Sequence, residues 1–252
     1  MDFIDGASAR RLARTAGGLY LINIVGGAFA IGIVPGMLVV TGDPSATAHN
    51  IQAHELLYRF GIAAHIVITV TNVFLAMIFY ELFKVVNRRL ALLVVFFTIV
   101  GTAVEAAGLI NQFVPLLLLG NGPYGSALSP TEAEALAYMP LALSTIGYSI
   151  NSVFFGCYGL CIAYLLFIST FLPRVIGVLM AIDGLAYLSY SFAHLLAPGF
   201  AAQLVPWIQL PSLFGEGSLC LWLLVVGVDL PRWEERVAAA IRLRSTPIEA
   251  RA

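Results

Sequence analysis

The stretch FGIAAHIVITVTNVFLAMIFY, at residues 60–80, contains no Lys, Arg, Asp or Glu. A helix needs about 20 predominantly apolar residues to cross the hydrocarbon core of a bilayer. The stretch is too long for a β-strand, which usually has about 3–10 residues, and its polar residues recur at helical spacing. It therefore predicts a membrane-spanning helix, and with it an integral membrane protein.

The composition of the whole chain agrees with this prediction. Of its 252 residues, 60% are hydrophobic and 11% are charged, whereas about 25% of the residues in soluble domains are charged. A soluble protein of this composition would not have enough polar groups to cover its surface. The net charge of −1 argues against nucleic acid as a partner, so the partner we expect is the lipid bilayer.

Five further apolar runs follow the same pattern, and turn or loop residues separate them. The motif Ser129-Pro130-Thr131-Glu132 is typical of a capping box, and we expect its helix to continue into the fourth span. The fold class we predict is all-α, a polytopic transmembrane helix bundle that forms a single membrane domain over residues 1–252. The six spans are placed at residues 15–40, 56–83, 90–119, 140–169, 174–197 and 204–228.

Basic residues predict how this bundle is oriented. Lys and Arg cluster on cytoplasmic loops, and all but one of the 13 in this chain fall on the same side of the six spans. We therefore expect both termini in the cytoplasm. The exception is Arg59, which follows Glu55 by four residues, and this spacing predicts an interfacial salt bridge.

Residues 229–252 follow the last span and are expected to lie in the cytoplasm. Trp233, Val237 and Ile241 repeat every four residues in this segment. The repeat predicts a short amphipathic helix on the cytoplasmic leaflet. A charged tail anchored by one tryptophan is the alternative.

Glycines recur within the predicted spans. Small residues let helix backbones approach one another closely in a membrane. We therefore expect Gly26-Gly27, Gly156 and Gly159 at helix–helix contacts.

Each predicted span also carries polar residues that share one helix face. Residues separated by three, four and seven positions lie on the same face, and ionisable groups in a span tend to face the bundle interior and to mark functional sites. Glu105, Asp183 and Glu216 each fall near the middle of a span. We expect these three carboxyls to be the catalytic groups of one pocket in the outer half of the bundle.

The ligand-binding residues that we expect around these acids are the amides, tyrosines and histidines of the same faces. They are His65, Asn111, Gln112, Tyr148, Asn151, Tyr187, Tyr190 and His194. Hydrogen bonding between helices, with no further role, is the alternative for such residues. We expect no metal site and no cofactor, because the sequence contains no HExxH motif, CxxC motif or phosphate-binding glycine loop.

Packing, turn and topology residues along most of the chain form a second pattern. They are Gly17-Gly18-Leu19-Tyr20-Leu21, Arg59-Phe60-Gly61-Ile62-Ala63, Val85-Val86-Asn87-Arg88, Phe154-Phe155-Gly156, Leu172-Pro173-Arg174 and Gly215-Glu216. With these residues the chain resembles a bacterial family catalogued as domain of unknown function 4386. The resemblance implies a six-helix, multi-pass bacterial membrane protein and no activity. Together with the predicted orientation, it places the chain in the bacterial cytoplasmic (inner) membrane.

Three functions remain open at this point. The first is an enzyme or a binding protein for a small lipid-soluble, isoprenoid-like ligand, with one carboxyl as general acid and another as base. The second is a non-catalytic membrane subunit or lipid sensor, whose protein partner is unknown. The third is a small proton-coupled transporter that uses the same acids as a relay.

Overall fold

The structure, a computed structural model, describes residues 3–205 and 207–245. Within these ranges the chain is helical and contains no β-strand, so the predicted all-α class is confirmed. Six segments of the described chain are long and apolar enough to cross a membrane, which confirms a multi-pass membrane protein. They are Gly6–Leu38, Glu55–Phe83, Arg88–Leu118, Pro130–Ser169, Arg174–Leu196 and Trp207–Val225.

Several of these segments consist of more than one helix. The helices are, in chain order, α1 (Gly6–Gly27), a π-helix (Ala28–Ile33), α2 (Val34–Leu38), α3 (Pro44–Ala53), α4 (Glu55–Phe83), α5 (Arg88–Asn111), α6 (Val114–Leu118), a 3₁₀ helix (Gly125–Ala127), α7 (Pro130–Ser169), α8 (Arg174–Leu196), α9 (Pro198–Leu204), a 3₁₀ helix (Trp207–Gln209), α10 (Leu210–Val225) and α11 (Leu230–Ser245). The first, third and last segments are therefore not single continuous α-helices.

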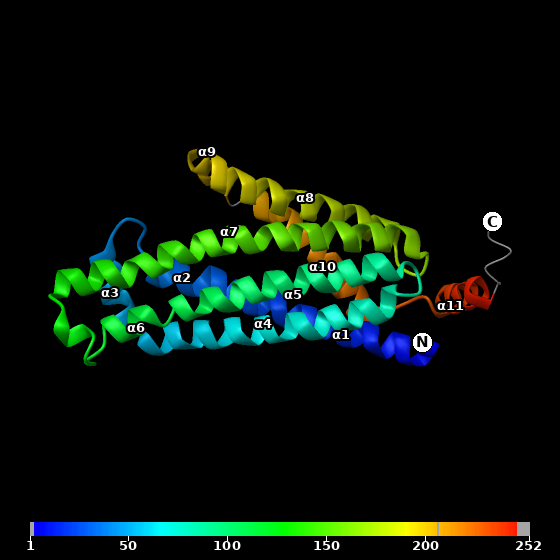
Figure 1. Cartoon of the computed structure of the whole chain (residues 1–252), viewed down its shortest axis with the longest axis horizontal. Helices are drawn as coiled ribbons and strands as arrows, with labels where there is room; N and C mark the ends of the chain where they lie inside the picture. The colour runs from blue at the N-terminus through cyan, green and yellow to red at the C-terminus, as the bar shows by residue number, and fades with distance from the viewer. Residues whose placement is uncertain (1–2, 206, 246–252) are drawn as a thin grey trace.

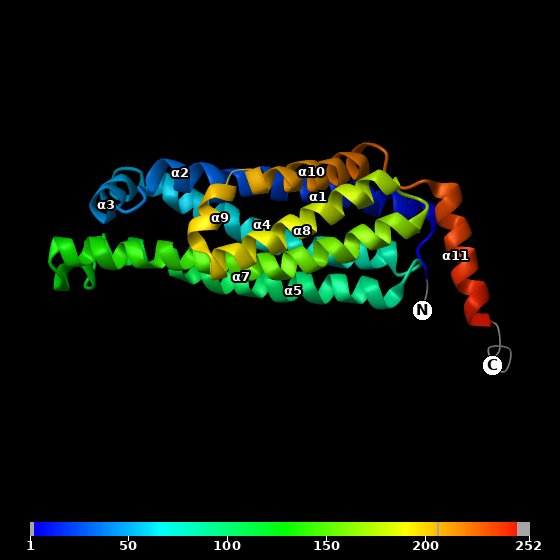
Figure 2. The same ribbon diagram turned by 90° about the horizontal axis from the view of Figure 1, so that it is seen from above.

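The long helices form a closed ring in chain order (Figures 1 and 2). α1 packs against α4, α4 against α5, α5 against α7, α7 against α8 and α8 against α10, and α10 closes the ring against α1. The N-terminus lies at the same end of the ring as α11 (Figure 1), whereas α3 and α6 lie at the opposite end. There the start of α7 extends beyond α8 and α9, because α7 has 40 residues and is about 60 Å long.

Side-chain caps fix where several helices begin. The side chains of Ser129 and Glu132 form the predicted capping box at the start of α7. Asn87 accepts hydrogen bonds from two backbone N–H groups in the first turn of α5. Asp5 caps α1 by accepting a hydrogen bond of 2.6 Å from the backbone N–H of Ser8, which lowers the pKa of this carboxyl below its ordinary value.

Glycines bring helix backbones together at several of the predicted positions. A Cβ placed at Gly156 would lie 3.0 Å from the carbonyl oxygen of Gly184, and one at Gly159 would lie 3.3 Å from the Cα of Gly184. α7 and α8 therefore cross almost backbone to backbone. Gly26 contacts a side chain of α4, as expected, but the prediction for Gly27 is wrong. No atom lies within 4 Å of a Cβ placed there, because Gly27 faces a cavity.

Apolar side chains fill the two ends of the ring. The larger cluster lies at the end that holds α11 and contains the rings of Phe79, Phe83, Phe171 and Trp233. Phe171 stacks on Phe83 with 6.1 Å between ring centroids and contacts Trp233 edge to face at 5.1 Å. The smaller cluster lies at the opposite end and consists of Val34, Leu38, Ile51, Tyr58 and Ile62.

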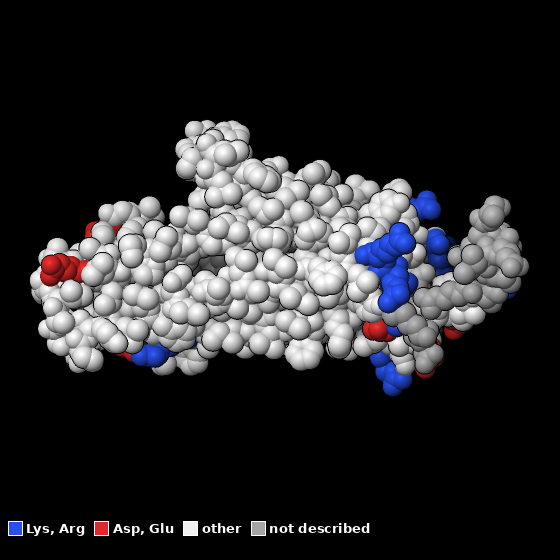
Figure 3. All heavy atoms as spheres, in the orientation of Figure 1, with Lys and Arg blue, Asp and Glu red and all other residues white. Residues whose placement is uncertain are grey.

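The C-terminal helix α11 lies across the end of the ring (Figure 2). Its Trp233 is fully buried. Arg236 donates to the carbonyl oxygen of Ile168 at 2.7 Å, and Arg232 donates to that of Thr170 at 3.1 Å, so α11 satisfies carbonyl groups at the C-terminus of α7. Lys and Arg side chains gather over this end of the face shown in Figure 3.

The predicted C-terminal helix is therefore present within the described residues. Of its apolar repeat, Trp233 is buried against the ring, whereas Ile241 is 52% exposed. Contact of this helix with the membrane leaflet stays a prediction, and the part of the predicted tail at residues 246–252 lies outside the described residues.

Gly17 provides a test of the contact that closes the ring. A Cβ at Gly17 would lie 2.4 Å from the backbone nitrogen of Leu224 and 2.7 Å from its Cα, and a backbone cannot move aside as a side chain can. We expect Gly17→Ala to lower the free energy of unfolding by about 1–3 kcal/mol. Reversible unfolding in mixed detergent micelles measures this change.

The neighbouring glycine is the matched control. No atom lies within 4 Å of a Cβ at Gly18, so Gly18→Ala should leave stability unchanged or raise it by up to about 1 kcal/mol. Equal losses of stability in the two variants would contradict the close approach of α1 and α10.

Candidate functional site

A cavity of about 390 Å³ lies inside the ring. At one end it is bordered by Tyr20, Leu75 and Tyr158 of the larger apolar cluster. Its size falls within the range of about 300–1,000 Å³ that is typical of small-molecule sites. Its wall is mainly apolar, and the polar residues in it are Tyr20, Asn23, Asn72, Thr98, Glu105, Tyr148, Asn151, Ser152, Tyr158, Tyr187, Tyr190, Gln209, Ser212 and Glu216.

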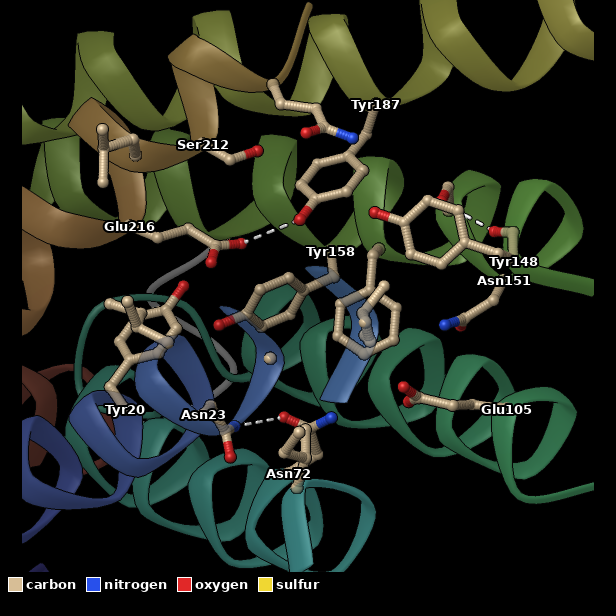
Figure 4. Close-up of a pocket in the computed structure, with 18 of the residues that line it drawn as sticks. Tyr20, Asn23, Asn72, Glu105, Tyr148, Asn151, Tyr158, Tyr187, Ser212 and Glu216 are labelled. Atoms are coloured by element: carbon tan, nitrogen blue, oxygen red, sulfur yellow. Dashed lines mark hydrogen bonds between the residues drawn. The ribbon is translucent and has the colours of Figure 1, made fainter. Parts of the chain in front are cut away.

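One side of the cavity is built around Glu216 of α10. Figure 4 shows its carboxyl group pointing inward, and Tyr187 of α8 donates a hydrogen bond to its Oε1 at 3.5 Å. The hydroxyl groups of Tyr20 and Tyr158 point toward the same region (Figure 4). All three tyrosines line the cavity together with Glu216. Glu216 is therefore surrounded by phenol groups from α1, α7 and α8.

Asp183 lies behind this side of the cavity, where α8 meets α10. Its side chain is 1% exposed, and Ser212 donates a hydrogen bond of 2.5 Å to its Oδ1. A Cβ at Gly215 would lie 3.0 Å from the Cβ of Asp183, so the absence of a side chain at Gly215 makes room for it. Asp183 does not line the cavity, but it packs against Gly215, the residue that precedes Glu216.

Glu105 of α5 reaches the cavity from the opposite side (Figure 4). Its Oε1 lies 2.7 Å from Nε2 of His65 on α4, and the two side chains are only 10% and 11% exposed. Oε2 of Glu105 and Nδ1 of His65 are buried without a hydrogen-bond partner among the described residues. We expected the three acids to meet in one pocket. They lie in two places instead, with Asp183 near Glu216 and Glu105 across the cavity.

The remaining predicted residues divide in the same way. Those that line the cavity are Tyr148, Asn151, Tyr187 and Tyr190. Asn111 and Gln112 do not line it, because α5 ends at Asn111 and the backbone oxygen of Gln112 accepts a hydrogen bond from Tyr58 at 2.8 Å. His194 also lies outside the cavity lining, with its Nδ1 at 2.9 Å from Oγ of Ser149.

Eight polar residues of the cavity wall were not among the predicted site residues, namely Tyr20, Asn23, Asn72, Thr98, Ser152, Tyr158, Gln209 and Ser212. Asn23 donates to Oδ1 of Asn72 at 2.6 Å, and Thr71 also hydrogen-bonds Asn23, which joins α1 to α4. The sequence held a signal for Tyr158. Positions 148, 151, 155 and 158 are separated by three, four and three residues, so Tyr158 continues the face that begins with Tyr148.

The π-helix Ala28–Ile33 forms another part of the wall. Ala28, Ile31 and Gly32 of this segment line the cavity. π-helices are rare, and they occur frequently at functional sites because the widened turn changes how side chains are presented. Among the described residues, no group of three or more His, Cys, Asp or Glu side chains is arranged to hold a metal ion.

This arrangement permits two kinds of chemistry. The apolar wall accommodates a lipid-soluble molecule, and the carboxyl and phenol groups hold a polar group of that molecule by hydrogen bonds. Glu216 and the Glu105–His65 pair also provide proton-transfer groups on two sides of whatever occupies the cavity.

Comparison with known proteins gives one match. Residues 15–227 match the family described as Domain of unknown function (DUF4386). No curated protein and no solved structure matches the chain. The matched range includes every residue that lines the cavity and ends before α11.

The Glu105–His65 pair can be tested with a double-mutant cycle. Replacing either residue with Leu leaves the other without its partner, so the loss in the double variant should be smaller than the sum of the single losses. We expect a coupling energy of about 0.6–1.7 kcal/mol, as for hydrogen bonds between membrane helices, measured by reversible unfolding in mixed micelles.

The predicted salt bridge between Glu55 and Arg59 supplies the control cycle. It is confirmed, with 2.7 Å between Oε1 and Nε, but both side chains are about half exposed (52% and 53%). Exposed helix pairs of this kind are worth about 0.3–0.5 kcal/mol. A coupling no larger for Glu105–His65 than for this pair would contradict a buried interaction.

Proposed function

The chain belongs to the family Domain of unknown function (DUF4386), and we propose that its ring of helices binds a small lipid-soluble molecule. The observation that carries the proposal is the cavity of about 390 Å³ inside the ring, mainly apolar and with a few converging polar groups. This combination is the usual character of small-molecule sites.

Glu216 is the residue we assign to the ligand's polar group. Its carboxyl group points into the cavity, and of its surroundings only Tyr187 donates a direct hydrogen bond within the described chain. Hydrogen bonds to a charged carboxylate are about twice as strong as those between neutral groups. A ligand group that donates to Glu216 would therefore fix both the position and the orientation of the molecule.

Access from the bilayer is supported by the surface between α5 and α7. Figure 3 shows a hollow in this face of the molecule, where these two helices run side by side in Figure 1. A lipid-soluble molecule would enter here without passing through water.

A second function, acid–base catalysis on the bound molecule, is favoured by the Glu105–His65 pair. This pair lies across the cavity from Glu216, and Oε2 of Glu105 has no hydrogen-bond partner in the described chain. One group would donate a proton while the other accepts one, as isomerisation of an unsaturated lipid requires. If the retained molecule gains no deuterium at carbon in D₂O, the protein binds without catalysing this reaction.

We also propose that the chain lies in the bacterial inner membrane with both termini in the cytoplasm. Ser126 and Glu235 are exposed residues at opposite ends of the ring. In a cysteine-free background, Ser126→Cys should react with a membrane-impermeant maleimide in intact cells, and Glu235→Cys only after lysis. The reverse pattern would overturn the orientation.

A cavity-filling variant tests ligand binding. Gly27 lines the cavity, and no atom lies within 4 Å of its Cβ position, so Gly27→Phe places a ring where the ligand would lie. We expect mass spectrometry of extracts to find a molecule retained by the purified wild-type protein, and Gly27→Phe to reduce its amount to background.

Gly18→Phe is the matched control for this experiment. Gly18 lies on the same helix and has equally open surroundings, but it does not line the cavity. It should retain the molecule in full. A wild-type protein that retains nothing, or a Gly27→Phe variant that retains as much as wild type, would contradict the proposal.

A further inference from the structure

We infer that the molecule bound in the cavity is a lipophilic amine, held in its protonated form with the ammonium group at Glu216. This inference rests on the proposed binding function and adds the chemical class of the ligand. Three observations carry it: the charges of the cavity wall, the aromatic rings around Glu216, and an unpartnered carboxylate oxygen on the opposite side.

The charged residues of the wall are all acidic. Among the described residues that line the cavity, Glu105 and Glu216 are the carboxyl groups, and none is Lys or Arg. The buried Asp183 adds a further acidic group next to Glu216. A bound fatty acid or phosphate would meet like charges in a medium of low dielectric, where an unpaired buried charge is costly. This set of wall residues therefore disfavours anionic ligands.

Aromatic rings line much of the cavity, and those of Tyr158 and Tyr187 lie beside Glu216 (Figure 4). Tyr148 and Tyr190 contact edge to face with 6.4 Å between centroids, and Phe155 and Tyr158 do so at 6.0 Å. All four line the cavity, as does Tyr187, which reaches Glu216 itself. The faces of such rings attract cations within about 6 Å of the ring centre. A carboxylate among aromatic rings matches an amine better than it matches a neutral alcohol.

The unpartnered atom on the opposite side is also an acceptor. The Glu105 side chain is nine-tenths buried and belongs to the cavity wall, and its Oε2 lacks a hydrogen-bond partner in the described chain. A buried acceptor without a donor costs about 1–3 kcal/mol. A donor group on the part of the ligand away from the ammonium group would relieve this cost, so the unpartnered oxygen indicates a ligand that extends across the cavity.

Three probes with the same ten-carbon chain test the inference: decylamine, decan-1-ol and decanoate. Isothermal titration into nanodiscs that hold the full chain, with empty nanodiscs as the blank, measures saturable binding of each probe. At neutral pH decylamine is protonated, as the lysine side chain is. We expect it to bind at least about tenfold more tightly than decan-1-ol, and decanoate to show no saturable binding.

The variant Glu216→Gln removes the charge but keeps the shape of the side chain. It should bring the affinity for decylamine down to that for decan-1-ol and leave decan-1-ol within about twofold of wild type. Glu55→Gln is the control, because Glu55 lies at the start of α4 and does not line the cavity. It should leave all three affinities unchanged.

The order of the three probe affinities for the wild-type protein tests the inference even if Glu216→Gln fails to fold. Binding of decan-1-ol or decanoate as tightly as decylamine overturns the inference and leaves the proposed binding function intact. Saturable binding of none of the three probes overturns the inference and counts against the binding function as well. Tighter binding of decylamine that persists in a folded Glu216→Gln variant overturns the assignment of the ammonium group to Glu216.

Discussion

Lipid offers no hydrogen-bond partner, so the polar side chains of a membrane span turn toward the protein interior. In this chain the constraint decides which way the helices face. On α4, Val70 and Phe74 are about half exposed, whereas Asn72 between them is 8% exposed and hydrogen-bonds α1. The same division on the other helices directs carboxyl, amide and phenol groups into the ring. The polar side of the cavity is therefore a consequence of closing six helices around a common axis.

The two sides of the cavity are supported in the same manner. Glu216 and Glu105 reach the cavity, and each has a second titratable residue behind it, Asp183 and His65 respectively. Ser212 in turn ties Asp183 to α10. Such second residues orient the groups that meet a ligand and tune their charge. The lining residues alone thus give an incomplete account of the chemistry of this cavity.

The sequence predicted the faces of the helices better than their relative positions. On α8, the spacing of Asp183, Tyr187 and Tyr190 identifies one face, and two of these residues line the cavity. Spacing along one helix does not show which other helices lie next to it. The ring order sets α10 between α1 and α8, so Glu105 of α5 lies across from Glu216 instead of beside it. α5 ends at Asn111. Gln112 therefore lies beyond the helix and does not continue the polar face on which we expected it.

The π-helix Ala28–Ile33 has a consequence for how this family of sequences varies. A segment with i→i+5 hydrogen bonds accommodates one residue more than an α-helix of the same span. Deletion of a single residue there would restore α-helical winding over the same length of helix. Val34 and Leu38, which belong to the smaller buried cluster, would then keep their orientation, whereas Ala28, Ile31 and Gly32 would be presented differently to the cavity. An alignment gap in this segment would therefore mark an altered cavity wall with unchanged packing of α2.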